Sequence, residues 1–427
     1  MDDGFNAVGK ELNWNDYAIF TYLIETPLDP LEAAMHLCQE QSTAQWKRVG
    51  VNEDFREKHG AKVIEVIVLE RNSHPLINFL ETANSMYRAR IKIAHPIINF
   101  GAKIPNLITA AAGEGAFFAP NINSIKLIDV ALPENFLKKF EGPRFGLEGI
   151  RKLLQVFDRP LFTGVVKPNI GLKPKDFAEI GYQALLGGLD IIKDDEMLAD
   201  VEYSPLKERL EEVMPLVFKA EQKTNEKKIY LANITDEVDK ILELHDLVAE
   251  YDSTAVMLNV MPMGLSSVRM LAKKTKIPIF SHFDFIAPFT RIPNFGVHSM
   301  LITKMQRLAG CDAIVMPGFG KRMIQKDDEV KANVSACLYD MKGIKKILPI
   351  PGGSDSAVTL PLMFEKLKTI DFSMVPGRGV FNHPMGPEAG ARSLRQAWEA
   401  ISKGKTIQEY SKTHKELSSS IDAFAKA

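Results

Sequence analysis

Two neighbouring stretches decide the expected fold: Gly164-Val-Val-Lys-Pro-Asn-Ile-Gly-Leu172 and Gly187-Gly-Leu-Asp-Ile-Ile-Lys-Asp-Asp-Glu196. Each contains a short apolar run typical of a buried strand, and each run ends in polar residues. Lys167 follows the first run, and Lys193, Asp195 and Glu196 follow the second. A helix-length segment separates the two runs, as in a parallel βα unit. The pattern predicts a polar site at the mouth of a β/α barrel.

Short apolar runs of this kind recur beyond residue 146 at intervals of about 30 residues, the size of one βα unit. There are eight: Leu161–Val166, Leu189–Ile192, Ile229–Ala232, Ala255–Val260, Ile277–Phe280, Ala313–Met316, Ile347–Ile350 and Phe372–Val375. Amphipathic, helix-forming segments such as Pro205–Lys223 lie between them. Eight strands close a parallel barrel, so we expect a (β/α)₈ barrel with a helical tail over residues 146–427. An open, doubly wound sheet is the alternative.

The first 145 residues lack this regular alternation. Four β-rich stretches occur there: Tyr17–Ile24, Ala61–Leu69, Ala89–Ala94 and Ser124–Asp129. One segment, Leu31–Gln39, has helical spacing. We therefore expect an α+β domain with an antiparallel sheet over residues 1–145. Glu141-Gly-Pro143 marks the boundary.

The composition excludes several classes of partner. The 53 basic and 54 acidic side chains nearly balance and form no long basic run, so nucleic acid is not an expected partner. The N-terminal segment is polar and acidic, and no apolar run has membrane-spanning length. The three cysteines are widely separated, which is typical of reduced thiols. These features predict a cytoplasmic protein that has no membrane partner.

The run Lys193-Asp194-Asp195-Glu196 has two interpretations. A charged run after a strand is often a solvated turn that begins the next helix. Closely spaced carboxylates at a strand end can also bind Mg²⁺, which prefers oxygen ligands. Alternate residues of an extended segment share a face, so Lys193 and Asp195 can point the same way and Glu196 can join them after a turn. A lysine that has reacted with CO₂ is a carbamate and also offers oxygen ligands.

Other polar residues follow the remaining strands of the expected barrel. Lys167 ends an apolar strand, where a buried lysine is costly without a role. His282 follows the fifth strand and can be either a core residue or a catalyst. Glycine-rich turns at 351–355 and 376–379 follow the seventh and eighth strands, where barrels often bind phosphate. Glycine is also the ordinary turn residue, so these turns do not by themselves establish a phosphate site.

Several motifs together resemble one family. These motifs lie at residues 40–50, 165–172, 231–236, 348–356 and 375–386. The chain is similar over nearly its whole length to RuBisCO large subunits. It resembles more closely the RuBisCO-like (form IV) proteins of the branch found in photosynthetic bacteria.

The resemblance implies a role for each matching residue. Lys193 matches a carbamylated lysine, and Asp195 and Glu196 match the other two Mg²⁺ ligands. Lys167 matches an acid–base lysine, and His282 matches a histidine that contacts substrate. Other implied substrate-binding positions are Glu40, Trp46, Asn169, Gly353, Ser354, Gly377, Arg378 and Gly379. In the family, the residues matching Glu40 and Trp46 complete the neighbouring subunit's site, which implies a homodimer.

The chain also departs from the RuBisCO pattern. Asn169 replaces a second lysine. Val315, Phe283 and Gly352 replace a histidine, an arginine and a serine that together hold the second phosphate of the substrate. Lys321 matches the mobile carboxylation lysine only if a one-residue gap is allowed.

Further departures surround the other phosphate and the reacting carbon. Gln45 replaces a phosphate-contacting threonine, and Ala110 replaces an asparagine near the reacting carbon. Arg378 replaces a glycine of the strand-eight turn, where it can either bind an anion or fill the space of one.

Three functions follow as hypotheses. The first is a Mg²⁺-dependent enolase or isomerase that abstracts a proton next to a carbonyl. Its substrate would be a small sugar-like or methylthio-sugar molecule carrying at most one phosphate, as in methionine salvage or sulfur metabolism. The second is an authentic ribulose-bisphosphate carboxylase, which the lost groups oppose. The third is a non-catalytic dimer with a vestigial site and a stress or regulatory role.

Overall fold

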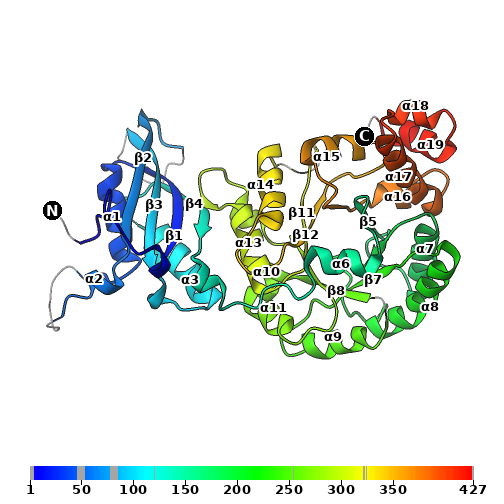
Figure 1. Ribbon diagram of the computed structural model, residues 1–427, viewed down its shortest axis with the longest axis horizontal. Helices are drawn as coiled ribbons and strands as arrows, with labels where there is room; N and C mark the ends of the chain where they lie inside the picture. Colours follow the sequence, from blue (N-terminus) through cyan, green and yellow to red (C-terminus); the bar gives the residue numbers. More distant parts are fainter. Residues whose placement is uncertain are drawn as a thin grey trace. The chain divides into compact units, whose positions relative to one another are not determined.

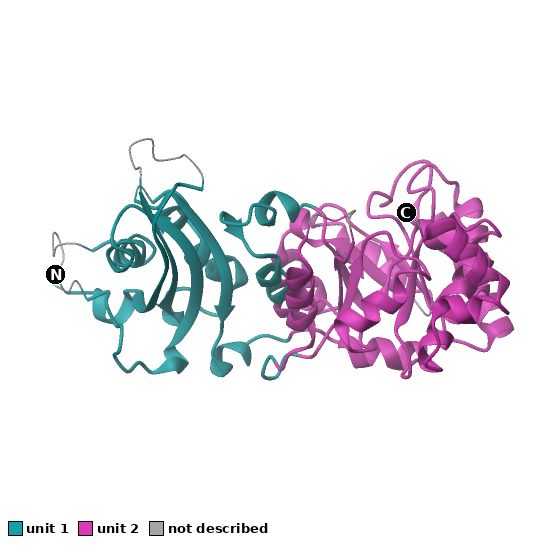
Figure 2. Cartoon of the chain, turned by 90° about the horizontal axis from the view of Figure 1, so that it is seen from above, with its two compact units in different colours: residues 1–141, 285–305, 341–344 teal, residues 142–284, 306–340, 345–427 magenta. Residues whose placement is uncertain are grey.

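The computed structural model describes residues 4–45, 53–76, 85–119, 121–252, 254–320, 323 and 325–425. Its elements are shown in Figure 1. The chain forms two compact units (Figure 2). The first contains Met1–Glu141, Phe285–Met305 and Met341–Ile344, and the second contains Gly142–Asp284, Gln306–Asp340 and Lys345–Ala427. The first unit thus takes in two segments from the stretch that the sequence assigns to the barrel, and the domain boundary at residue 145 stays a prediction.

The first unit is built on a five-stranded sheet with strand order β10-β4-β1-β3-β2. Its strands are β1 (Tyr17–Thr26), β2 (Lys62–Ser73), β3 (Met86–Pro96), β4 (Ser124–Ala131) and β10 (Gly296–Val297). The four long strands pair antiparallel, which confirms the expected sheet. Alternate residues of β1, among them Phe20 and Tyr22, face the core. The short β10 adds a parallel edge beside β4, so the sheet is mixed.

Short helices complete the first unit. The longest of them, α1 (Pro30–Glu40), contacts β2 and β3. It starts at Asp29, whose side chain accepts a hydrogen bond from the Leu31 N–H. The others are η1 (Trp14–Asp16), α2 (Arg56–His59), η2 (Ile97–Asn99), α3 (Ile104–Ala112), α4 (Glu114–Phe117), α5 (Glu134–Leu137) and α12 (Ala287–Thr290).

The second unit contains a parallel eight-stranded sheet in the order β12-β11-β9-β8-β7-β6-β5-β13. Its strands are β5 (Leu161–Val165), β6 (Ile191–Lys193), β7 (Ile229–Asn233), β8 (Thr254–Asn259), β9 (Ile279–His282), β11 (Ala313–Pro317), β12 (Leu348–Gly352) and β13 (Ser373–Met374). Each overlaps one of the eight predicted apolar runs. The end strands β12 and β13 also contact each other, so the sheet nearly closes into a barrel. This arrangement confirms the (β/α)₈ prediction, and the open-sheet alternative is wrong.

Helices follow the strands as the sequence predicts. They are α7 (Pro174–Leu186), α8 (Leu206–Thr224), α9 (Ile241–Ala249), α10 (Val260–Met263), α11 (Leu265–Ala272), α14 (Asp327–Leu338), α15 (Leu360–Leu367), α16 (Arg378–Phe381) and α17 (Pro387–Ser402). Another helix, α13 (Ser299–Ala309), starts in a segment of the first unit and ends in the second. The helical tail consists of α18 (Ile407–Ser411) and α19 (Lys415–Phe424).

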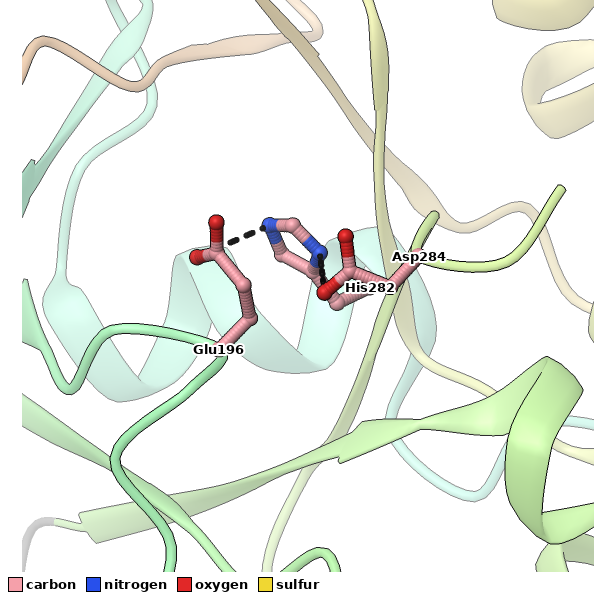
Figure 3. A group of neighbouring side chains, drawn as sticks. All are labelled: Glu196, His282 and Asp284. Carbon is pink, nitrogen blue, oxygen red and sulfur yellow. Dashed lines mark ion pairs between the residues drawn. The ribbon is translucent and has the colours of Figure 1, made fainter. Parts of the chain in front are cut away.

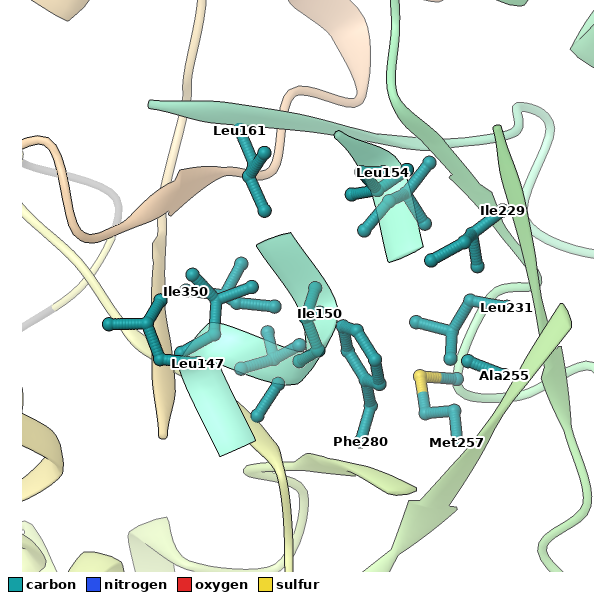
Figure 4. Close-up of a cluster of buried hydrophobic side chains, with 14 of the residues drawn as sticks. Leu147, Ile150, Leu154, Leu161, Ile229, Leu231, Ala255, Met257, Phe280 and Ile350 are labelled. Carbon is teal, nitrogen blue, oxygen red and sulfur yellow. The ribbon is translucent and has the colours of Figure 1, made fainter. Parts of the chain in front are cut away.

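One further helix, α6 (Gly146–Leu154), closes the amino-terminal end of the barrel. Its apolar residues Leu147, Ile150 and Leu154 are buried in one cluster with residues from the strands (Figure 4). Asp312, immediately before β11, accepts hydrogen bonds from the Phe145 and Gly146 N–H groups at the start of α6. The opposite end of the barrel, where the strands finish, is therefore the end available for a site.

Two sequence expectations about the chain's surroundings can be compared with the structure. Among the described residues, no helix is long and apolar enough to cross a membrane. Cys38, Cys311 and Cys337 are all buried as free thiols.

Candidate active site at the carboxyl end of the barrel

The structure brings Lys167, Lys193, Asp195 and Glu196 together at the carboxyl ends of β5 and β6. Lys193 is fully buried, and its Nζ donates to the Asp194 carbonyl oxygen at 2.7 Å and lies 3.4 Å from Glu196 Oε2. Lys167 Nζ lies 2.8 Å from Asp195 Oδ2. Two amines and two carboxylates thus share one small volume.

Asp194, the remaining acid of the run, points the other way. Its carboxylate accepts hydrogen bonds from the Tyr230 hydroxyl and the Asn233 N–H, both at 2.8 Å, and from Arg209 at 3.3 Å. Asp194 and Arg209 are both fully buried. The alternation expected from an extended segment is therefore present, and Asp194 belongs to the framework of the site rather than to its surface.

Two asparagines hold the backbone of the turn that carries Glu196. Asn233 Nδ2 donates to the carbonyl oxygens of Asp195 and Glu196, at 3.2 and 3.0 Å. Asn259 Nδ2 donates to the Glu196 carbonyl oxygen at 2.9 Å. These residues end β7 and β8, so the neighbouring strands fix the position from which the Glu196 side chain projects.

The electrostatic balance at Lys193 favours its neutral form relative to an exposed lysine. Burial lowers the pKa of Lys193, while the Glu196 and Asp195 carboxylates raise it in part. Burial also raises the pKa of Glu196, but the charge of Lys193, followed by the neighbouring His282, lowers it by more and leaves that pKa at about 2. Glu196 is therefore ionised throughout the physiological range.

His282 ends β9 beside the same carboxylate (Figure 3). Its Nε2 lies 3.4 Å from Glu196 Oε2, and its Nδ1 lies 3.2 Å from Asp284 Oδ2. Sequence reasoning did not single out Asp284. The available signal was its position two residues after His282, since residues at that spacing share a face of an extended chain.

The two glycine-rich turns lie at the same end of the barrel. A Cβ on Gly377 would come within 3.0 Å of Lys167 Cε, so the lysine side chain lies against the turn after β13. A Cβ on Gly379 would come within 2.2 Å of the Asp355 carbonyl oxygen, so only glycine allows the two turns to approach this closely. Gly353 is half-buried, and Ser354 and Arg378 are exposed. Anion binding by these turns stays a prediction.

The remaining predicted residues fall in different places. Asn169 is half-buried, two residues after Lys167. Glu40 is the exposed last residue of α1 in the first unit, where it lines a hollow of about 670 Å³ with His59, His95 and Ala110 among others. Trp46 and Lys321 lie outside the described residues.

The positions that depart from RuBisCO at the second phosphate are now packing residues. Val315 belongs to the buried core cluster, and Phe283 packs against that cluster and stacks on His282. Gly352 is also buried, and a Cβ there would come within 2.6 Å of Val375. None of these three side chains can bind a phosphate through a charged or hydroxyl group.

Comparison with known proteins agrees with this architecture. Residues 146–424 match the catalytic domain of the ribulose bisphosphate carboxylase large chain, and residues 14–136 match its N-terminal domain. The chain belongs to the RuBisCO large-chain family. Within that family it is 53% identical to the ribulose bisphosphate carboxylase-like protein of Chlorobaculum tepidum, covering 98% of this chain and 97% of that one.

Other members of the family are less similar. A 3-oxo-isoapionate-4-phosphate decarboxylase of Rhizobium etli is 32% identical, covering 95% of this chain and 98% of the relative. Among solved structures, the RuBisCO of Pyrococcus horikoshii superposes with a TM-score of 0.90 at 28% identity, covering 99% of this chain and 96% of that one. The relative at 53% identity places the chain among the RuBisCO-like members of the family.

Proposed function

We propose that this protein is a Mg²⁺-dependent enolase or isomerase that abstracts a proton next to a carbonyl group, and that it does not fix CO₂. The observation that carries the proposal is the convergence of Lys167, Lys193, Asp195 and Glu196 at the carboxyl end of the barrel. A metal-binding carboxylate pair beside an amine supplies the two requirements of enolisation, a charged stabiliser and a base.

The donor set fits Mg²⁺. Asp195 and Glu196 offer carboxylate oxygens, and Lys193 offers a third oxygen ligand if CO₂ converts it to a carbamate. The fit rests on the burial of Lys193, because burial lowers its pKa and a neutral amine is the form that reacts with CO₂. When bound, Mg²⁺ would polarise the substrate carbonyl and make the adjacent C–H more acidic.

Lys167 is placed to move the proton. Its side chain leaves β5, passes Gly377 and ends beside Asp195, and it is 29% exposed, so substrate can reach it. As a free amine, Lys167 would take the proton from carbon, and as an ammonium it would return the proton to the neighbouring carbon. Asn169 and His282 would contact the substrate's oxygens.

The substrate would be a small sugar-like or methylthio-sugar molecule with one phosphate. The turns with Gly353, Ser354, Gly377, Arg378 and Gly379 would bind that one phosphate through backbone N–H groups and the Arg378 side chain. Packing residues occupy the positions at which RuBisCO holds a second phosphate. The family includes a protein named as a 3-oxo-isoapionate-4-phosphate decarboxylase, which supports an enzyme that acts on a phosphorylated substrate with a carbonyl group.

The proposal includes a cytoplasmic homodimer in which Glu40 and Trp46 complete the neighbouring subunit's site. A solved structure that is 30% identical to this chain is named as a dimeric archaeal RuBisCO from Hyperthermus butylicus, which supports this assembly. A pathway in sulfur or methionine-salvage metabolism would fit a methylthio-sugar substrate.

Proton exchange in D₂O tests the proposal even when the product is unidentified. The protein, with Mg²⁺ and bicarbonate, is incubated with a panel of ketose phosphates, methylthio-ketose phosphates and keto-acid phosphates. Deuterium incorporation next to the carbonyl is followed by mass spectrometry. We expect exchange with at least one panel member, and a loss of about 100-fold or more in Lys167→Ala, because general acid–base catalysis contributes about 10²–10⁴-fold. Lys175→Ala, on α7, is the matched control.

Three outcomes would contradict the proposal. Exchange that survives Lys193→Ala would remove the metal-site lysine from the mechanism. Mg²⁺-dependent incorporation of labelled CO₂ into ribulose bisphosphate would identify a carboxylase. A melting temperature that does not change with Mg²⁺ plus bicarbonate, together with no exchange, would favour the non-catalytic role, since a ligand that binds only the folded state raises its stability.

A further inference from the structure

We infer that Glu196, His282 and Asp284 form a second metal site, which takes a divalent transition-metal ion and needs no CO₂. The three residues come from the ends of β6 and β9, and one ligand atom of each lies within 4.8 Å of the others. Figure 3 shows the imidazole ring between the two carboxylates.

The state of His282 points to a metal rather than to a hydrogen bond. The residue is 4% exposed, and its Nδ1 is buried with no hydrogen-bond partner in the described part of the chain. Asp284 Oδ2 lies only 3.2 Å from this nitrogen, but the geometry is not that of a hydrogen bond. A buried nitrogen that makes no hydrogen bond is costly, and a cation shared with the Asp284 carboxylate would satisfy both groups.

Each carboxylate lies at a ligand-like distance from a different nitrogen of the imidazole ring. Ligand atoms that bind one ion at about 2.0–2.2 Å lie about 3.0–3.5 Å from one another. Asp284 Oδ2 lies 3.2 Å from His282 Nδ1, and Glu196 Oε2 lies 3.4 Å from His282 Nε2 on the other edge of the ring. An ion would take one of these nitrogens. The two acids are 39% and 26% exposed, so rotation of either side chain can bring the second oxygen into place.

The ligand types select the class of ion. One imidazole nitrogen with two carboxylate oxygens suits Zn²⁺, Co²⁺, Mn²⁺ or Fe²⁺, whereas Mg²⁺ prefers an all-oxygen shell. This site therefore differs from the proposed Mg²⁺ site in its histidine, in Asp284 and in needing no carbamate on Lys193, whose Nζ lies 3.4 Å from Glu196 Oε2.

The two sites share Glu196, which has a regulatory consequence that rests on the proposed function. The Glu196 carboxylate cannot be a full ligand of two ions at once, so an ion at the histidine site would weaken Mg²⁺ binding at the carbamate site. Transition ions would then inhibit the proposed reaction by competition. Binding at the histidine site itself does not depend on that reaction.

Titration with Co²⁺ in CO₂-depleted buffer tests the inference. The metal-free protein is titrated and followed by calorimetry and by the visible absorption of nitrogen-coordinated Co²⁺. We expect saturable binding in wild type and in Lys193→Ala. Asp284→Ala and the isosteric Asp284→Asn should weaken it by at least about tenfold, the lower limit even for loss of a second-shell partner. Glu212→Ala, which removes an exposed acid of α8, is the matched control.

Either of two results would overturn the inference. The first is that both Asp284 variants, natively folded by circular dichroism, bind Co²⁺ as tightly as wild type does, or that wild type itself binds no Co²⁺. The second is Co²⁺ binding that requires bicarbonate and disappears in Lys193→Ala, which would assign the ion to the proposed Mg²⁺ site. Mg²⁺ binding in the presence of bicarbonate, measured separately, tests the proposed function. The second metal site and the proposed function can therefore fail independently.

Discussion

Two buried aspartates of the barrel show how a partner's charge decides the state of a carboxyl group. Asp190 faces the Arg159 guanidinium at 2.6 and 2.7 Å, and this pairing overcomes the effect of burial and leaves the pKa of Asp190 at about 2. Asp355, in the turn after β12, accepts hydrogen bonds from backbone N–H groups such as that of Val375, and within the described residues no cationic side chain pairs with it. Burial therefore raises the pKa of Asp355 to about 7.

Asp355 should make stability depend on pH. Its folded pKa is about 7 against 3.8 unfolded, so its contribution is fully present below pH 4 and is lost as the pH rises to 7. The loss amounts to at most about 4 kcal/mol. Asp355→Asn, which keeps an acceptor for the Val375 N–H, should flatten the fall in unfolding free energy between pH 4 and 7. Urea unfolding across this range measures it.

The exposed Asp239 supplies the control, because Asp239→Asn should leave the slope unchanged. Identical slopes in wild type and Asp355→Asn would mean that Asp355 is ionised in the folded protein well below pH 7.

At this scale the sequence predicts some residues and not others. The period of two along a strand correctly separated Lys193 and Asp195 from Asp194. It could not show that Asp194 meets Arg209 and Tyr230, because those contacts join residues 15 and 36 positions away. Asp284 was not predicted as a site residue, because a single acid in a loop does not form a recognisable motif.

At the scale of elements, α6 covers the amino-terminal end of the barrel. Ile150 is fully buried among the strand residues, whereas Leu153 on the same helix is 43% exposed. Ile150→Ala should therefore lower the free energy of unfolding by about 2–5 kcal/mol, through lost burial and the cavity left behind. Leu153→Ala, measured by the same urea titration, should change it by less than about 1 kcal/mol. Equal losses in the two variants would show that α6 is not packed as described.

The elements were predictable where a pattern repeats. Eight apolar runs at regular intervals gave the barrel strands, because a buried parallel strand needs a continuous apolar run. The position of α6 was not predictable, since helical periodicity identifies an apolar face but not its partner. The two residues of β10 are too few to form a pattern at all.

At the scale of the molecule, the first unit is discontinuous in sequence. Residues 285–305 supply β10. They also provide a hydrogen-bond acceptor for the buried Lys126, whose Nζ donates to the Thr290 carbonyl oxygen at 2.8 Å. In the same unit Lys304 pairs with Asp129. The unit therefore depends on a segment that lies more than 140 residues beyond its first 141.

A fragment of residues 1–141 should fold poorly by itself. It would leave β4 as an open sheet edge and Lys126 as a buried charge without its acceptors. We expect it to unfold at lower urea concentration, and to associate more on size-exclusion chromatography, than a fragment in which a flexible linker adds residues 285–305. A monomeric 1–141 fragment of equal stability would refute this dependence.

The same discontinuity matters while the chain is being made. The ribosome completes β4 at residue 131 and reaches the end of β10 only at residue 297. At about 5–20 residues per second, this interval lasts on the order of ten seconds. During that time this edge of β4 stays unpaired, so we expect the rate of translation between the two strands, and any chaperone bound to the chain there, to affect how much of the protein folds.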